Sequence, residues 1–104
     1  MQRGEVRLYP FDYPDKKRPV VVLTRDSALE VLTAVTVAPI TTKVRAIQTH
    51  VLLTIDDGMK EDCAVSLDAI QTVAKKHLGP PITRLNGYKM AMIRRAANFA
   101  LGFD

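Results

Sequence analysis

Cysteine and histidine are scarce in this sequence, and their scarcity excludes several kinds of site. Cys63 is the only cysteine among the 104 residues, which rules out an internal disulfide and a metal site built from several cysteines. The two histidines, His50 and His77, match no metal-binding or nucleophile motif in their spacing. We therefore expect His50 to be structural within a strand, His77 to be exposed, and Cys63 to be a core residue rather than a nucleophile.

Glycine-rich loops and long apolar runs are missing as well. The five glycines are scattered, so the sequence has no glycine-rich loop that could cradle a phosphate. No apolar run approaches the length of a membrane span, and the first residues lack the apolar segment of a signal peptide. We expect a cytoplasmic protein with no membrane partner. An acidic cluster around residue 58 is too short for a calcium-binding loop and is most simply a solvated turn: Asp56, Asp57, Glu61 and Asp62.

The composition is that of a folded and basic chain. Hydrophobic residues make up 47% and charged residues 25%, and the length suits a single domain over 1–104 with one core. The net charge of +4 is uneven, because residues 1–62 carry nine basic and nine acidic side chains whereas residues 63–104 carry six and two. This excess suits a polyanion or an acidic partner, although a solvated basic face would give the same composition.

Short apolar or alternating segments indicate a chain made mostly of strands. The expected strands are residues 5–9, 18–24, 32–38, 50–55, 63–67 and 70–73. Loops, turns and breaks are expected at residues 10–17, 25–27, 41–48, 56–58 and 79–81. Several short strands before one helix favour a small antiparallel barrel with a terminal helix, and the fold class is therefore mainly β with a C-terminal α-helix.

The expected helix begins near Asn86, which can cap it, and ends at Gly102. One apolar stripe has helical spacing, and a second lies beside it: Met92, Ala96, Phe99 and Phe103. Together the stripes cover about half of the circumference, more than one-sided burial requires. We therefore predict that the second stripe is buried in a homodimer, the alternative being that one wide barrel face takes both.

Two strands carry polar groups at one end, and these groups form the most informative pattern in the chain. Arg18 stands just before a run apolar enough to be buried on both faces, and Thr41 and Thr42 follow Pro39, near which the strand should end. A guanidinium and a hydroxyl at neighbouring strand ends could hold a phosphodiester, with Lys16, Lys17 and Lys43 close in sequence. Arg18 could equally be a structural arginine at a sheet edge, and Thr41 an ordinary strand-ending hydroxyl.

Four segments give the chain a family resemblance. RGEV at 3–6, RPVVVL at 18–23, VAPIT at 37–41 and DAIQTV at 68–73 occur in this order. In this respect the sequence resembles the MazF/PemK toxins of type II toxin–antitoxin systems, and the resemblance runs from Gln2 to Asp104. It implies an SH3-like barrel, shared with the related CcdB-type toxins, in a homodimeric protein. It also implies an acidic antitoxin as partner and a sequence-specific endoribonuclease acting on single-stranded RNA.

The resemblance assigns the catalytic roles to Arg18 and Thr41. Attack by the ribose 2′-hydroxyl on the adjacent phosphate needs no metal or cofactor, only a held geometry and charge stabilisation. We expect a further set of residues to bind RNA: Lys16, Lys17, Thr42, Lys43, Arg45 and Gln71. The loop 10–17 is shorter than in many family members, and Ala69 and Gln71 depart from the usual pattern, which affects the preferred RNA sequence. The alternative function is a non-catalytic module of the same fold that binds nucleic acid or poisons gyrase.

Overall fold

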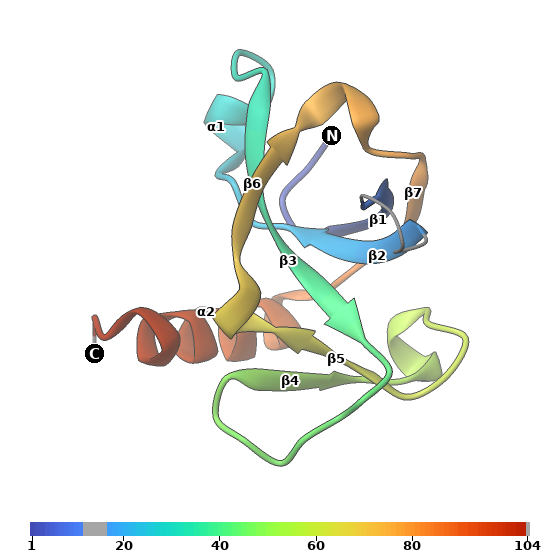
Figure 1. Ribbon diagram of the computed structural model, residues 1–104, viewed down its shortest axis with the longest axis vertical. Helices are drawn as coiled ribbons and strands as arrows, with labels where there is room; N and C mark the ends of the chain where they lie inside the picture. The colour runs from blue at the N-terminus through green and yellow to red at the C-terminus, as the bar shows by residue number, and fades with distance from the viewer. Residues whose placement is uncertain (12–16, 104) are drawn as a thin grey trace.

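A strongly curled antiparallel sheet dominates the computed structural model, which describes residues 1–11 and 17–103 (Figure 1). Its strands are β1 (Glu5–Pro10), β2 (Lys17–Val22), β3 (Ala34–Thr41), β4 (His50–Leu53), β5 (Cys63–Ser66), β6 (Gln71–Ala74) and β7 (Pro81–Arg84). They pair in the order β4-β5-β3-β2-β1-β7, and β6 pairs with β3 off this path. The helix α2 (Gly87–Leu101) follows the last strand and lies across one end of the half-barrel. The mainly β fold with a C-terminal helix, predicted from the sequence, is confirmed.

β3 organises the sheet because it changes partners along its length. One of its edges pairs with β2, from Val22↔Val37 to Val20↔Pro39. Its other edge pairs first with β6 over residues 34–37 and then with β5 through Ile40 and Thr41. The strand expected over 32–38, with its end near Pro39, runs instead to Thr41, three residues further. Pro39 lies between the end of the β6 pairing and the start of the β5 pairing, where its missing N–H interrupts neither of them.

The valines of β2 are buried on both faces of the sheet, as their run of apolar residues predicts. Val20, Val21 and Val22 are all completely buried. Val21 packs in the main core with Ile40 and with Ile93 of α2, whereas Val20 and Val22 belong to a second cluster on the opposite face. This burial fixes the end of β2 at which Arg18 stands.

The helix α2 begins and ends where the sequence predicts. The Asn86 side chain accepts a hydrogen bond from the Lys89 N–H at 2.9 Å, and Gly102 ends the helix in the left-handed conformation with φ 75°. Ile93 and Ala96 are buried against the sheet. In the described part of the chain, neither this helix nor the four-residue α1 (Asp26–Leu29) is long and apolar enough to cross a membrane.

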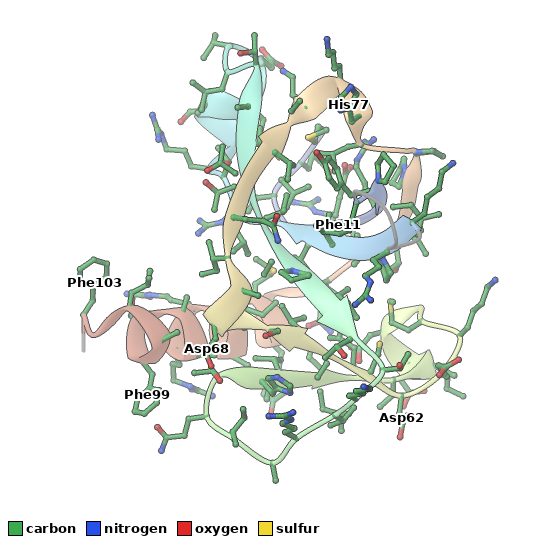
Figure 2. All side chains as sticks on the ribbon, viewed as in Figure 1. Phe11, Asp62, Asp68, His77, Phe99 and Phe103 are labelled. Carbon is green, nitrogen blue, oxygen red and sulfur yellow. The ribbon has the colours of Figure 1, made fainter. Side chains whose placement is uncertain are left out.

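The second apolar stripe of α2 divides between the core and the solvent. Ala96 is buried and Met92 packs against the core, so the barrel covers half of the stripe. Phe99 and Phe103 remain exposed, at 49% and 79%, and point to different sides of the helix in Figure 2. They do not share one face because the helix ends at Leu101 and Gly102 turns the chain.

Short elements that the sequence did not predict account for the remaining differences. α1 (Asp26–Leu29) occupies the break expected at 25–27, because burial of Ala28 and Leu29 stabilises a single turn. β7 begins at Pro81, where only a rigid break was expected; an edge strand tolerates proline because that position needs no ladder donor. The turn at 56–58 is the end of a 3₁₀ helix, η1 (Ile55–Asp57).

Candidate functional site

The strand register brings Arg18 and Thr41 to the same place. The last pair of the β2–β3 ladder is Val20↔Pro39, and the same register continued by two residues sets Arg18 opposite Thr41. In the described part of the chain, the β2–β3 ladder ends with Val20↔Pro39, whereas the other edge of β3 continues to pair with β5, where Thr41 faces Ala64. The guanidinium and the hydroxyl therefore stand on either side of the point where the sheet opens.

A cleft of about 630 Å³ occupies this opening. Its apolar lining includes the buried Ile40 and Cys63, together with Leu8, Pro19, Met59 and Ile82. Exposed polar side chains line it as well, namely Lys17, Arg18, Thr42, Lys43, Lys60 and Glu61, and Thr41 lies half-buried among them. Four cations beside hydroxyl groups can hold a phosphodiester by charge and by hydrogen bonds.

The hydroxyl of Thr41 is oriented by its own loop. Its Oγ1 atom accepts a hydrogen bond from the Lys43 N–H at 3.1 Å, a local turn of the kind that threonine commonly forms. Because the oxygen is used as an acceptor toward the backbone, its hydrogen is left to donate to a bound group. A phosphate oxygen in the cleft is an acceptor that suits this hydrogen.

The predicted RNA-binding residues are only partly gathered here. Lys17, Thr42 and Lys43 line the cleft, and Lys16 lies outside the described residues. Arg45 and Gln71 do not line it. Arg45 is exposed in the loop before β4, where its backbone N–H donates to Nδ1 of His50 at 3.2 Å. Gln71 is exposed on β6, and its side-chain amide donates to the Ala69 carbonyl at 3.4 Å. RNA contacts by these two residues stay predictions.

The wall opposite β2 was missed from the sequence. Met59, Lys60 and Glu61 come from the segment between η1 and β5, and Ile82 comes from β7. From the sequence, the acidic cluster around Gly58 was predicted to be a solvated turn, with no role in a binding site. Pairing of β5 with the end of β3 brings this turn to Arg18, and that pairing has no local signal.

Cys63 is a core residue that touches the cleft. Its side chain is 3% exposed, and burial raises the pKa of its thiol, with Glu61, Asp57 and Asp62 adding to the shift through their negative charge. The thiol is therefore held in the protonated form, which is a poor nucleophile and a poor base. His50 accepts a backbone hydrogen bond within β4, and His77 is exposed, as the sequence predicts.

Two further observations concern other places where a ligand or a metal ion could bind. A larger hollow of about 980 Å³ lies between α1, β3 and β6, but Arg18, Thr41 and the predicted RNA-binding residues that the structure describes do not line it. The described residues 1–11 and 17–103 contain no group of three or more histidine, cysteine or acidic side chains that could hold a metal ion.

Comparison with known sequences finds one family along nearly the whole chain. The model for the PemK-like, MazF-like toxins of type II toxin–antitoxin systems matches residues 2–101. Endoribonuclease MazF3 of Mycobacterium tuberculosis is 42% identical over 88 residues, which cover 85% of this chain and 82% of that protein.

Solved structures give the same grouping. The Mycobacterium tuberculosis toxin MazF-mt6 superimposes with a TM-score of 0.88 at 35% identity, over 96% of this chain and 98% of its own. A mycobacterial endoribonuclease in complex with its cognate antitoxin also gives a TM-score of 0.88, at 25% identity, over 100% of this chain and 97% of its own. The similarity therefore includes the strands and the turn that line the cleft.

Proposed function

Because the chain belongs to the PemK-like, MazF-like toxins of type II toxin–antitoxin systems, we propose that it is an endoribonuclease toxin cleaving single-stranded RNA. The observation that carries this proposal is the presence of Arg18 and Thr41 in one cleft with Lys17 and Lys43. The cleavage is sequence-specific, as the family resemblance implies, and it needs no metal ion to supply a nucleophile, because the nucleophile is the 2′-hydroxyl of the substrate itself.

Arg18 holds the scissile phosphate and stabilises the charge that develops on its non-bridging oxygens. A planar guanidinium offers several donors in a fixed arrangement that matches these oxygens. Thr41 donates its hydroxyl hydrogen to the same phosphate and fixes its orientation, supported by its contact with the Lys43 N–H. A held geometry and a stabilised phosphorane are what an internal attack requires.

Lys17, Lys43 and Thr42 bind the RNA backbone on either side of this phosphate. Such contacts position the chain without reading bases. Replacing Lys17 and Lys43 by alanine should weaken binding and reduce its salt dependence by about one charge contact each. Binding measured over a salt series tests this, and an unchanged slope would place the RNA elsewhere.

An acidic antitoxin segment inhibits the enzyme by covering the same cleft. One of the similar structures is a complex with a cognate antitoxin. In this chain, the basic cleft and the basic C-terminal half suit an acidic peptide that folds on docking. The neighbouring reading frame should then encode a small acidic protein whose co-expression restores growth.

Cleavage of single-stranded RNA in EDTA tests the proposed reaction. We expect cleavage to persist in the chelator, to leave a 2′,3′-cyclic phosphate, and to stop when the cleavage position carries 2′-deoxyribose. Removing one preorganised donor costs about 3–4 kcal/mol of barrier, so Arg18→Ala should slow cleavage by a factor of about 100 to 1,000. Arg18→Lys should not restore the rate, and Thr41→Ser should retain more activity than Thr41→Val.

Two outcomes would contradict the proposal. Folded Arg18→Ala protein that cleaves at the wild-type rate would show that the active site lies elsewhere. Wild-type protein that binds RNA or gyrase without cleaving RNA would instead favour the non-catalytic alternative.

A further inference from the structure

The turn between η1 and β5 forms a firmly held wall of the cleft. At its start, Thr54 and Asp57 form a reciprocal cap, in which the Thr54 N–H donates to Asp57 Oδ2 at 2.9 Å. The Lys89 ammonium lies 3.6 Å from the same carboxylate oxygen. Thr83 of β7 donates its hydroxyl to the Asp57 carbonyl at 3.1 Å. Three elements therefore hold this end of the turn.

The rest of the turn is fixed from the core. The Met59 N–H donates to the Thr54 carbonyl at 3.3 Å, and the Met59 side chain packs against the main core. Cys63 is buried where β5 begins. Between these anchors, Lys60 and Glu61 line the cleft, whereas Asp62 does not and points away from β2 (Figure 2). The position of Glu61 is thus set by a backbone that is held on both sides.

The proposed reaction needs a group that takes the proton of the attacking 2′-hydroxyl, and most of the cleft cannot supply one. Guanidinium and ammonium groups donate hydrogen bonds and offer no lone pair, so neither kind of side chain serves as a base. Threonine hydroxyls are weak bases, and Cys63 is held as a thiol by its burial. Among the described residues, Glu61 contributes the one carboxylate of the lining.

Resting on the proposed ribonuclease activity, we propose that Glu61 is the general base of the cleavage reaction. Its carboxylate takes the proton from the 2′-hydroxyl as the 2′-oxygen forms a bond to phosphorus. The bond from phosphorus to the 5′-oxygen breaks, and the 5′-oxygen takes a proton from water. The products are a 2′,3′-cyclic phosphate and a 5′-hydroxyl, and Glu61 returns its proton to the solvent. Arg18 and Thr41 keep the roles given above.

The charges around Glu61 are consistent with this role. A carboxylate repels a phosphate, so Glu61 does not favour binding of the RNA backbone, whereas taking up a proton is a role that suits its charge. The charged and titratable groups that line the cleft with Glu61 are Lys17, Arg18, Lys43, Lys60 and Cys63, and the same turn carries Asp57 and Asp62.

Glu61→Gln keeps the size of the side chain and removes the base. The matched control is Asp62→Asn, which makes the same change in charge one residue away and outside the cleft. We expect Glu61→Gln to slow single-turnover cleavage at saturating RNA about 100-fold or more, the usual contribution of a general base. Its affinity for an uncleavable 2′-deoxy RNA should not fall, and Asp62→Asn should cleave like the wild type.

The pH profile separates a base from a merely structural residue. A reaction that needs a carboxylate base loses rate toward acidic pH, so the wild-type single-turnover rate should show an acidic limb that is absent in Glu61→Gln. Formate added to Glu61→Ala should restore part of the rate, because a small carboxylate can enter the space left by the side chain. Circular dichroism of each variant checks that it is folded.

The outcomes distinguish this inference from the function on which it rests. A wild-type protein that cleaves no RNA refutes both. If the wild type cleaves and Arg18→Ala does not, but Glu61→Gln keeps the wild-type rate and acidic limb, only the role of Glu61 is refuted. A Glu61→Gln variant that loses RNA affinity at an unchanged saturated rate also overturns the assignment, because its carboxylate then binds rather than reacts.

Discussion

Gly58 is the position at which a single methyl group should disturb the cleft most. Its φ of 94° lies in the left-handed region, which costs a residue with a Cβ about 1 kcal/mol. A Cβ at this position would also stand 2.4 Å from Oγ1 of Thr83, the hydroxyl that donates to the Asp57 carbonyl. Relieving this overlap requires Thr83 to move and its hydrogen bond to break. Together these effects should lower the free energy of unfolding of Gly58→Ala by about 3–5 kcal/mol.

Two other glycines provide matched controls. Gly102 has φ 75° and no atom within 4 Å of the added Cβ, so Gly102→Ala should lose only the backbone contribution of about 1 kcal/mol. Gly87 has open space and an ordinary φ at the first turn of α2, so Gly87→Ala should lose nothing and can gain up to about 1 kcal/mol of helix propensity. The three variants thus separate strain of the backbone from contact with the neighbouring strand.

Urea unfolding followed by circular dichroism, at one protein concentration, measures the three differences. We expect the order Gly87→Ala, Gly102→Ala, Gly58→Ala from most to least stable. Gly58→Ala should also cleave RNA more slowly at a temperature where it is still folded, because the turn that carries Lys60 and Glu61 must shift. If Gly58→Ala and Gly102→Ala lose the same stability, the close approach of the turn to β7 does not limit the fold, and the reasoning fails.

Three further outcomes concern pH, assembly and the lone thiol. Burial alone would raise the pKa of Glu5, but the hydrogen bond from Arg7 at 2.9 Å, a backbone hydrogen bond from Gln2 and the positive charges of Arg7 and the N-terminus together lower it. The ionised Glu5 carboxylate therefore stabilises the fold at pH values above 4.5, its pKa in the unfolded chain, and this stabilisation is lost as the pH falls through the lower pKa of the folded protein. Glu5→Gln should accordingly lower the free energy of unfolding at neutral pH and match the wild type in acid. Light scattering at micromolar concentration should give the mass of a homodimer, and a monomeric mass for the wild type would contradict this. Phe99→Asp should favour the monomer more than Phe103→Asp does, since Phe99 adjoins the buried face of α2. Iodoacetamide should modify Cys63 slowly in the native protein and rapidly in urea, and fast native modification would contradict its burial.

Local patterns in the sequence determined the ends of elements and the character of their faces. The apolar run after Arg18 predicted a strand buried on both faces, and the side chains of Val20–Val22 are completely buried in the two cores on either side of the sheet. Asn86 and Gly102 fixed the limits of the helix because capping depends on a few adjacent residues. The same locality allowed Arg18 and Thr41 to be singled out, since each stands where an apolar strand meets a polar loop.

What the sequence could not determine is which distant segments meet. The partner exchange along β3 sets where Pro39 is tolerated and where the β2–β3 ladder opens, and it depends on pairing with β5 and β6. That pairing carries the turn with Glu61 to the side of Arg18, so a segment that reads as solvated by composition becomes a wall of the cleft. The end of α2 is a similar case, because Gly102 separates Phe99 from Phe103 although their spacing suggests one face. Strand pairing over long separations is decided by burial of the whole core, which no local stretch of sequence encodes.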